Sequence, residues 1–486
     1  MQRPHPWRGP LRQGLLDGHV PTLRSTAAML TSLTALAATS LIAAPSVAVP
    51  LSEACALRRT EAHHSEGLDT WNAAYPRPTR DLDAVLVFLS FPDSTPVTSP
   101  EQLTADHFPD TSLFFERASY GKFAFRPHPH RQWLQMPRRS TSYAIRRDWN
   151  APHRAAYLKD ALATADPHID FSRYDIVYFI ADPHAPGVDS DATKVVNLES
   201  PLKVDGTGLR RVVTVFEKHP PDRLVLAHET GHVFDLPDLY HRPVDGKGDW
   251  DTHVGDWDLM GSQFALAPDF FAWHKWKLGW LEQHQVACVS GAGVTRLTLE
   301  AVGAGPARRA EGTVQAGSAG GREVSGGGAS GRGSGAGDAT SGDGGATGDG
   351  GANGRGGGSG DILSAGAQAA FGAGRGTKLA VVPTGPDSAL GIEVRGAVGN
   401  DSSVCAEGVL IYRVRSSAES GSGPIQVLDA HPLTGACWDD SVYPPLADAP
   451  MRVGESFTVP GEGVRVEVEG RTPSGEWTVK ITTTGW

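Results

Sequence analysis

Apolar positions between Asp81 and Leu281 fall into short runs separated by polar, glycine-rich and proline-rich stretches. Continuous apolar runs predict buried strands at Leu82–Phe91, Tyr174–Ala181 and Leu209–Phe216. Helical patterns lie between and after them, at Thr111–Ser119, Ala151–Ala165, Asp222–Phe234 and near Phe270–Leu281. Because helices and strands alternate, we expect residues 81–287 to form an α/β (α+β) domain with helices packed on a sheet.

The pattern changes near Cys288. Short strands separated by turns are expected at Val294–Val302, Thr377–Val382, Gly391–Val394, Val409–Val414, Ile425–Leu428, Val464–Val468 and Trp477–Thr483. This spacing is typical of an antiparallel β-sandwich, which we assign to residues 288–486. Residues 303–376 are dominated by Gly, Ser, Ala and Asp and bury too little apolar surface to offset the entropy cost of ordering. We therefore expect a disordered insertion within this β domain.

The N-terminus is typical of an export signal. Arg12 and Arg24 precede a small-residue apolar stretch, Ser25–Ala44, and residues 46–48 fit a small-x-small cleavage pattern. We predict a signal peptide over residues 1–48, cut after residue 48 or after residue 44, and hence a secreted protein. A transmembrane anchor is disfavoured because the stretch is rich in Ala, Ser and Thr and no basic stop follows it.

Residues 49–80 are either an N-terminal segment of the mature protein or a short propeptide. They contain His63 and His64, which are expected to be surface residues rather than ligands. Four cysteines follow the signal, and an even number in an oxidising compartment predicts two disulfides. Of the three possible pairings we favour Cys405–Cys437 and Cys55–Cys288. A Cys55 thiolate that caps a zinc ion in a latent form is the alternative.

The length of the chain limits the number of domains, and its net charge excludes one class of function. The 486 residues suggest about two or three domains. Lys plus Arg number 44 against 55 Asp plus Glu, a formal net charge of −11, which argues against a nucleic-acid-binding protein because such a protein needs a basic face. We expect a monomer without a stable membrane anchor.

The segment His228-Glu229-Thr230-Gly231-His232 carries the clearest chemistry. Two imidazoles four residues apart on a helix point to the same side, so both can reach one zinc ion. Glu229 lies beside the first ligand and can contact a metal-bound water as a general base. The flanking residues are apolar, and buried imidazoles and carboxylates are costly there unless a metal pairs with them.

A third ligand is expected ten residues after His228, where Asp238 stands. In the pattern H-E-x-x-H-x-x-G-x-x-H the last histidine occupies that offset, and here aspartate replaces it. Asp235 stands at the glycine position, where we expect a positive φ that aspartate tolerates better than most residues. Asp238 could instead be only a turn carboxylate, with Glu217 or a later acid as the third ligand. Met260, in Gly255–Ser262, fits a methionine turn beneath the zinc.

Together these motifs resemble the secreted bacterial metalloproteases of the immune inhibitor A type. The matching segments are His228–Tyr240, Gly255–Ser262 and Phe271–Leu281, with weaker support from Phe114–Lys122. The resemblance covers roughly residues 81–281 and implies a metzincin-like catalytic domain, a zinc cofactor, and protein or peptide substrates outside the cell. It also implies that structural calcium could bind, for which an acidic cluster is available, although a solvated loop is the alternative: Asp245, Asp249, Asp251, Asp256 and Asp258.

The sequence therefore predicts a zinc-dependent endopeptidase in which His228, His232 and Asp238 hold the metal and Glu229 is the general base. Tyr240 could donate a further hydrogen bond to the substrate or pack under the turn. Two other functions stay open. One is a zinc amidase acting on cell-wall peptides, and the other is an exported binding protein whose peptidase domain has decayed.

Overall fold

The computed structural model describes residues 53–222, 224–243, 248–305 and 376–484. The described residues belong to one compact unit. The predicted signal peptide and nearly all of the predicted insertion therefore lie outside the described residues. Within the described part of the chain, no helix has the length and apolar character needed to cross a membrane.

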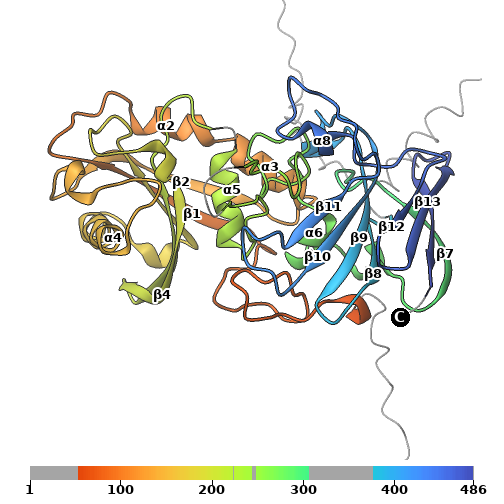
Figure 1. Cartoon of the computed structure of the whole chain (residues 1–486). Helices are drawn as coiled ribbons and strands as arrows, with labels where there is room; N and C mark the ends of the chain where they lie inside the picture. The colour runs from red at the N-terminus through yellow and green to blue at the C-terminus, as the bar shows by residue number, and fades with distance from the viewer. Residues whose placement is uncertain (1–52, 223, 244–247, 306–375, 485–486) are drawn as a thin grey trace, which may run out of the picture. The chain divides into compact units, whose positions relative to one another are not determined.

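The first half of the described chain is built on a five-stranded sheet (Figure 1). Its strand order is β2-β1-β3-β5-β4, and all neighbouring pairs are parallel except the last, in which β4 forms an antiparallel edge. The strands are β1 Leu82–Ser90, β2 Phe125–Gln135, β3 Ile176–Ala181, β4 Lys194–Val204 and β5 Thr207–Val215. The helices of this half are α2 Pro100–His107, α3 Asp110–Ala118, α4 Ala151–Ala165 and α5 Val225–Val233, whereas the later helix α6 Ala272–Lys277 packs against the second half.

Both faces of this sheet are covered, which explains the continuous apolar run of β1. Successive side chains of a strand point to opposite faces, and here Leu86 and Phe88 join one hydrophobic cluster while Val87 and Leu89 join another. The first cluster includes apolar residues of α3 and α5, and the second includes those of α4. The sheet therefore places α5, which carries the two histidines, on the face opposite α4.

The second half contains two further sheets. The larger has the order β11-β10-β9-β8-β6 and the smaller has the order β12-β13-β14-β7. Their strands are β6 Val286–Cys288, β7 Gly293–Leu299, β8 Leu379–Pro383, β9 Ser388–Arg395, β10 Gly408–Arg415, β11 Ile425–Leu428, β12 Ser456–Val459, β13 Val464–Arg471 and β14 Trp477–Thr483. One hydrophobic cluster draws residues from both sheets, as in a sandwich. The expected antiparallel pairing holds except between β6 and β8, which are parallel.

Short elements and two disulfides complete the fold. The remaining helical turns are η1 Glu53–Cys55, η2 Ser140–Tyr143, η3 Phe171–Arg173, η4 Ser190–Ala192, η5 Gln283–Gln285, η6 Gly399–Asp401 and α8 Pro444–Ala447. Cys55 pairs with Cys288 and Cys405 pairs with Cys437, so both favoured pairings are confirmed. The alternative of a free Cys55 thiolate is wrong.

Several element boundaries differ from the sequence prediction. The helix expected from Asp222 begins only at Val225, because Leu224 adopts a left-handed conformation with φ of 57°. The helix expected near Phe270–Leu281 is reduced to α6, and Gly279, at φ 82°, follows it. Strands β2 and β4 were not predicted. Strand β2 (FRPHPHRQWLQ) is mostly exposed at the sheet edge and has no apolar periodicity.

Candidate metal centre

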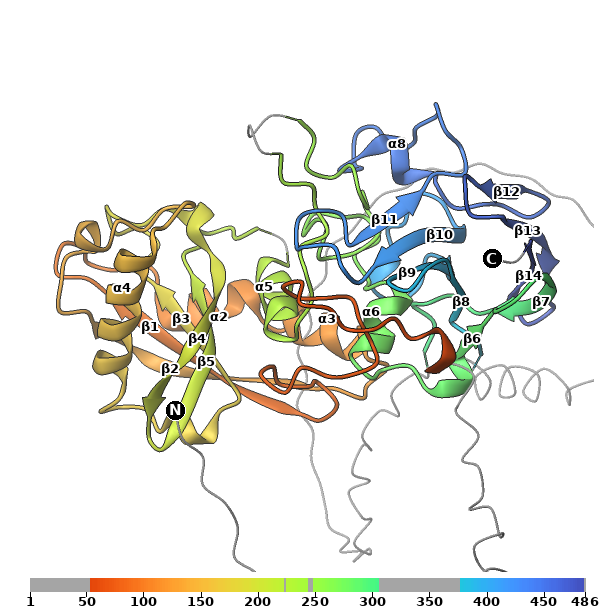
Figure 2. The ribbon, with the colours of Figure 1, turned by 60° about the horizontal axis from the view of Figure 1, so that its bottom comes forward.

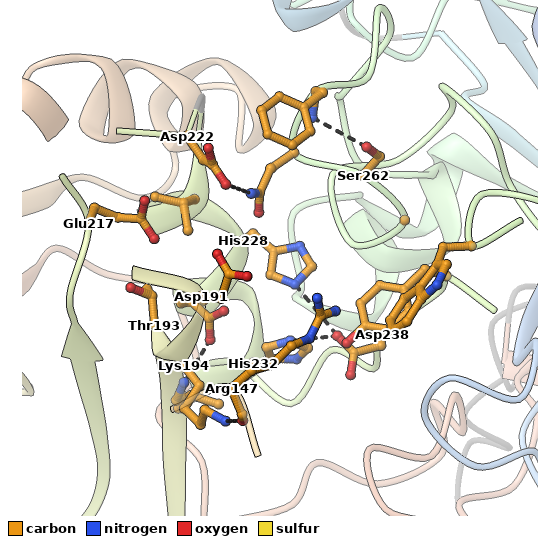
Figure 3. A pocket seen from close by; sticks show the side chains of 18 of the residues that line it. Arg147, Asp191, Thr193, Lys194, Glu217, Asp222, His228, His232, Asp238 and Ser262 are labelled. Carbon is orange, nitrogen blue, oxygen red and sulfur yellow. Dashed lines mark hydrogen bonds and ion pairs between the residues drawn. The ribbon is translucent and has the colours of Figure 1, made fainter. Parts of the chain in front are cut away.

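Helix α5 brings His228, Glu229 and His232 to the site (Figure 3). All three side chains are buried, each less than a tenth exposed. The imidazole rings of His228 and His232 lie one helical turn apart with centroids 5.0 Å from each other. Every residue of α5 is buried, so these polar groups lie in the interior and not on a solvated helix face.

Backbone carbonyls fix the orientation of both imidazoles. His228 Nδ1 lies 2.9 Å from the carbonyl oxygen of Leu259, and His232 Nδ1 lies 2.8 Å from that of Leu236. A carbonyl can only accept, so each Nδ1 carries the hydrogen and each Nε2 presents a lone pair. This is the arrangement in which metal-bound histidines are held by their second nitrogen.

Asp238 supplies a third ligand atom. Its Oδ1 lies 2.9 Å from His232 Nε2 and 3.5 Å from His228 Nε2, and the three ligand atoms all lie within 4.8 Å of one another. No hydrogen bond of normal geometry reaches this buried oxygen. Two imidazole nitrogens and a carboxylate oxygen thus converge on one point, and their lone pairs repel one another unless a proton or a metal ion lies between them. The donor set of two imidazoles and one carboxylate fits zinc.

The pKa values of His232 and Asp238 also indicate that a positive charge is favoured at this point. Burial works against the charged forms of both groups, yet their mutual attraction outweighs it. The pKa of His232 is raised to about 9 by Asp238, and the pKa of Asp238 is held well below its usual range by His232. The site therefore stabilises a proton or a metal ion beside the Asp238 carboxylate.

Glu229 lies beside the ligands with one carboxylate oxygen already engaged. Its Oε2 accepts a hydrogen bond of 2.6 Å from the backbone nitrogen of Val195 on the edge strand β4. Burial raises the pKa of Glu229 against the lowering effect of His228 and His232. A carboxylate with a raised pKa and one oxygen not held by Val195 is suited to general acid–base work.

These groups open onto a cavity of about 570 Å³. In Figure 3 Glu217 and Asp222 lie on one side of the histidines, and Arg147 and Lys194 lie on another. Tyr240 also lines the cavity, and its ring is stacked on that of His228 at a centroid distance of 6.4 Å. The volume lies in the range of ligand-binding clefts. Besides the three ligand residues and Glu229, the lining includes Arg147, Asp191, Lys194, Glu217, Asp222, Arg242, Trp250 and Phe264.

Met260 lies directly beneath α5. It is fully buried, and a Cβ added to Gly231 would lie only 2.4 Å from its sulfur. Asp258 shapes this turn, because its Oδ1 accepts from the backbone nitrogen of Met260 and its Oδ2 lies 2.9 Å from His274 Nδ1. The turn also contains Leu259, whose carbonyl holds His228. The methionine predicted from the sequence therefore packs where it supports the helix, in the same turn as the carbonyl that holds His228.

The turn between His232 and Asp238 has the backbone that the sequence predicted. Asp235 has φ of 66°, a left-handed conformation that glycine adopts freely and aspartate less easily. Its side chain is fully buried and contacts Arg59 and His64 of the N-terminal segment. The expectation that His64 is a surface residue is therefore wrong, because only 4% of it is exposed; His63 is exposed as expected.

A loop of the second half also reaches the candidate metal centre. Ser420, between β10 and β11, donates from Oγ to Asp238 Oδ2 at 3.2 Å and accepts from the Asp238 backbone nitrogen at 2.9 Å. The backbone nitrogen of Gly421 donates to the Asp238 carbonyl. Sequence reasoning assigned no role in the site to this loop, since nothing in its composition indicates a neighbour about 180 residues away.

The other candidate ligands are placed differently. Glu217 lines the cavity, but the ligand-atom cluster found among the described residues consists of His228, His232 and Asp238. In the acidic cluster considered for calcium, Asp256 accepts hydrogen bonds from Leu266 N, Val442 N and Ser441, and Asp258 is engaged by the methionine turn. Asp245 lies outside the described residues. Calcium binding by this cluster stays a prediction without support from these contacts.

Comparisons with known proteins add no relative. No protein-family model matches the chain, and a search of curated proteins finds no significant match. The functional interpretation therefore depends on the geometry of the site.

Proposed function

We propose that this chain is a secreted zinc-dependent endopeptidase with a metzincin-like catalytic domain. One observation carries the proposal: two imidazole Nε2 atoms and a buried carboxylate oxygen converge beside a glutamate, and all four side chains line one cavity. His228, His232 and Asp238 would hold the ion. The two disulfides support export, because such bonds persist in oxidising compartments.

A zinc ion bound by these side chains would acidify a water molecule and polarise the scissile carbonyl. Glu229 accepts the proton of the attacking water at Oε1, while Val195 holds Oε2. Glu229 then returns this proton to the nitrogen of the departing amine, so the proton balance closes within one turnover. Tyr240, which lines the cavity beside His228, would donate a hydrogen bond to the substrate carbonyl oxygen.

Casein hydrolysis by the full secreted chain tests this proposal. We expect cleavage that a zinc chelator abolishes and that Glu229→Gln lowers by about 10²- to 10⁴-fold, with the zinc content of that variant unchanged. His232→Ala should lose the metal. Glu101→Gln, at an exposed position of α2, is the matched control and should cleave normally.

Each other outcome removes part of the proposal. Normal cleavage by Glu229→Gln would refute the role of the glutamate. Zinc binding without casein cleavage, but with cleavage of purified peptidoglycan, would replace the endopeptidase with a cell-wall amidase. A protein that binds no zinc and cleaves neither substrate would instead be an exported binding protein.

A further inference from the structure

The N-terminal segment, residues 53–80, is built into the core although it contains almost no regular structure. Leu57, Ser65 and Glu66 are each at most 4% exposed, and Cys55 is bonded to Cys288. Figure 2 shows this segment in red, running past α5 and α6. Chains buried to this degree are parts of a domain rather than appendages to it.

The segment meets the metal centre at Asp235, the residue that replaces glycine in the ligand turn. Arg59 Nη2 lies 2.6 Å from Asp235 Oδ2, and His64 Nδ1 lies 2.9 Å from Asp235 Oδ1. Lys277 of α6 donates to the backbone carbonyl of Asp235 at 2.7 Å and to that of Ser65 at 2.8 Å. A carboxylate is thus buried where glycine would carry no side chain, and the N-terminal segment supplies its partners.

His64 connects three parts of the site. Its ring is stacked on that of His232 with centroids 5.7 Å apart. Its Nε2 lies 3.4 Å from the side-chain nitrogen of Asn197 on strand β4, so Nε2 accepts and Nδ1 donates to Asp235. One imidazole therefore contacts a ligand, the ligand turn and the edge strand beside Glu229.

The turn that Asp235 anchors bears directly on two ligands. The carbonyl of Leu236 accepts from His232 Nδ1, and Asp238 supplies the third ligand atom. A shift of Asp235 would move both groups, because only two residues separate it from Asp238 and left-handed backbone is strained without support.

We propose that Arg59 and His64 are positioning residues, which act through Asp235 to hold the turn that orients His232 and presents Asp238. This inference rests on the proposed zinc site. It also makes the N-terminal segment a permanent part of the mature protein and not a removable propeptide. Contacts beyond the ligands commonly tune metal affinity by about 10- to 100-fold.

Zinc affinity of the full, disulfide-intact chain tests the inference, measured by competition with a chelator. Asp235→Gly keeps the left-handed backbone and deletes the carboxylate, whereas Arg59→Ala removes one partner from a partly exposed position. His64→Ala removes the donor, and His64→Asn restores one, because the asparagine Nδ2 takes the place of Nδ1. Arg58→Ala is the matched control, since Arg58 is exposed in the same segment.

We expect zinc affinity to fall about 10- to 100-fold in Asp235→Gly, Arg59→Ala and His64→Ala, with recovery in His64→Asn and no change in Arg58→Ala. The visible absorption spectrum of the cobalt-substituted protein should shift in the first three variants, because it reports ligand geometry rather than stability. Circular dichroism identifies the variants that fold. If Asp235→Gly does not fold, Arg59→Ala still tests the inference.

Two results would overturn the inference, and they are distinguishable. Folded variants with wild-type zinc affinity and an unchanged cobalt spectrum would show that these residues do not position the turn, with the zinc site intact. A wild-type protein that binds no zinc would refute the proposed function itself, and the inference with it.

Discussion

Replacing Gly231 by alanine should destabilise this protein, although the same change in an ordinary helix is favourable by about 1 kcal/mol. The added Cβ would lie 2.4 Å from Met260 Sδ and 3.1 Å from its Cε. Normal contact needs about 3.5–4.0 Å, so the two atoms must separate by more than about 1 Å. Met260 is fully buried, and overpacking of this kind costs about 1–3 kcal/mol.

The double-mutant cycle with Met260→Ala assigns the cost to this contact. Met260→Ala alone leaves a cavity and should cost about 2–5 kcal/mol. In Gly231→Ala/Met260→Ala the new methyl group occupies part of that cavity, so the two effects should couple by about 1–3 kcal/mol in the favourable direction. Urea unfolding followed by tryptophan fluorescence measures all four proteins.

Gly470→Ala is the matched control, because a Cβ added there meets nothing within 4 Å. It should leave stability within about 0.5 kcal/mol of the wild type. If the changes in unfolding free energy caused by Gly231→Ala and Met260→Ala add to within about 0.5 kcal/mol in the double mutant, the new Cβ does not clash with Met260 and the reasoning is refuted.

Three further results are expected. Ser420→Ala should weaken zinc binding about 10-fold in chelator competition without unfolding the protein, because Asp238 loses its side-chain partner; unchanged affinity would remove this loop from the site. Burial lowers the pKa of His107 to about 4, against the raising effect of Asp106. Between pH 6.5 and 4 the His107 imidazole is therefore protonated in the unfolded chain but not in the folded one, so the free energy of unfolding decreases as the pH falls. Urea unfolding across that range should show a smaller loss in His107→Gln, and an equal loss would exclude His107 as the source. The intact mass of the secreted protein should include Cys55; a mature chain that starts after residue 80 would contradict the role given to the N-terminal segment.

Local sequence patterns predicted much of the first sheet, because a strand that is buried on both faces consists of a continuous run of apolar residues. The run at Leu82–Phe91 became β1, and Ala151–Ala165 became α4 with the same bounds. Strand β2 escaped prediction because it pairs through its backbone at an exposed edge, where side chains need not alternate. The start of α5 was placed too early, since the left-handed Leu224 has no signature in the sequence.

The sequence by itself determined the chemistry of the candidate site, because the spacing of His228, Glu229 and His232 on one helix is a local property of the chain. Only the tertiary structure decided how that chemistry is held. The ligand turn is contacted by three residues that lie about 170 to 180 positions away in the sequence, namely Arg59, His64 and Ser420. Contacts over such separations produce no periodic pattern in the sequence. Asp235 shows the division most clearly: its left-handed backbone follows from its place in the motif, whereas the partners of its buried carboxylate follow from how distant segments pack.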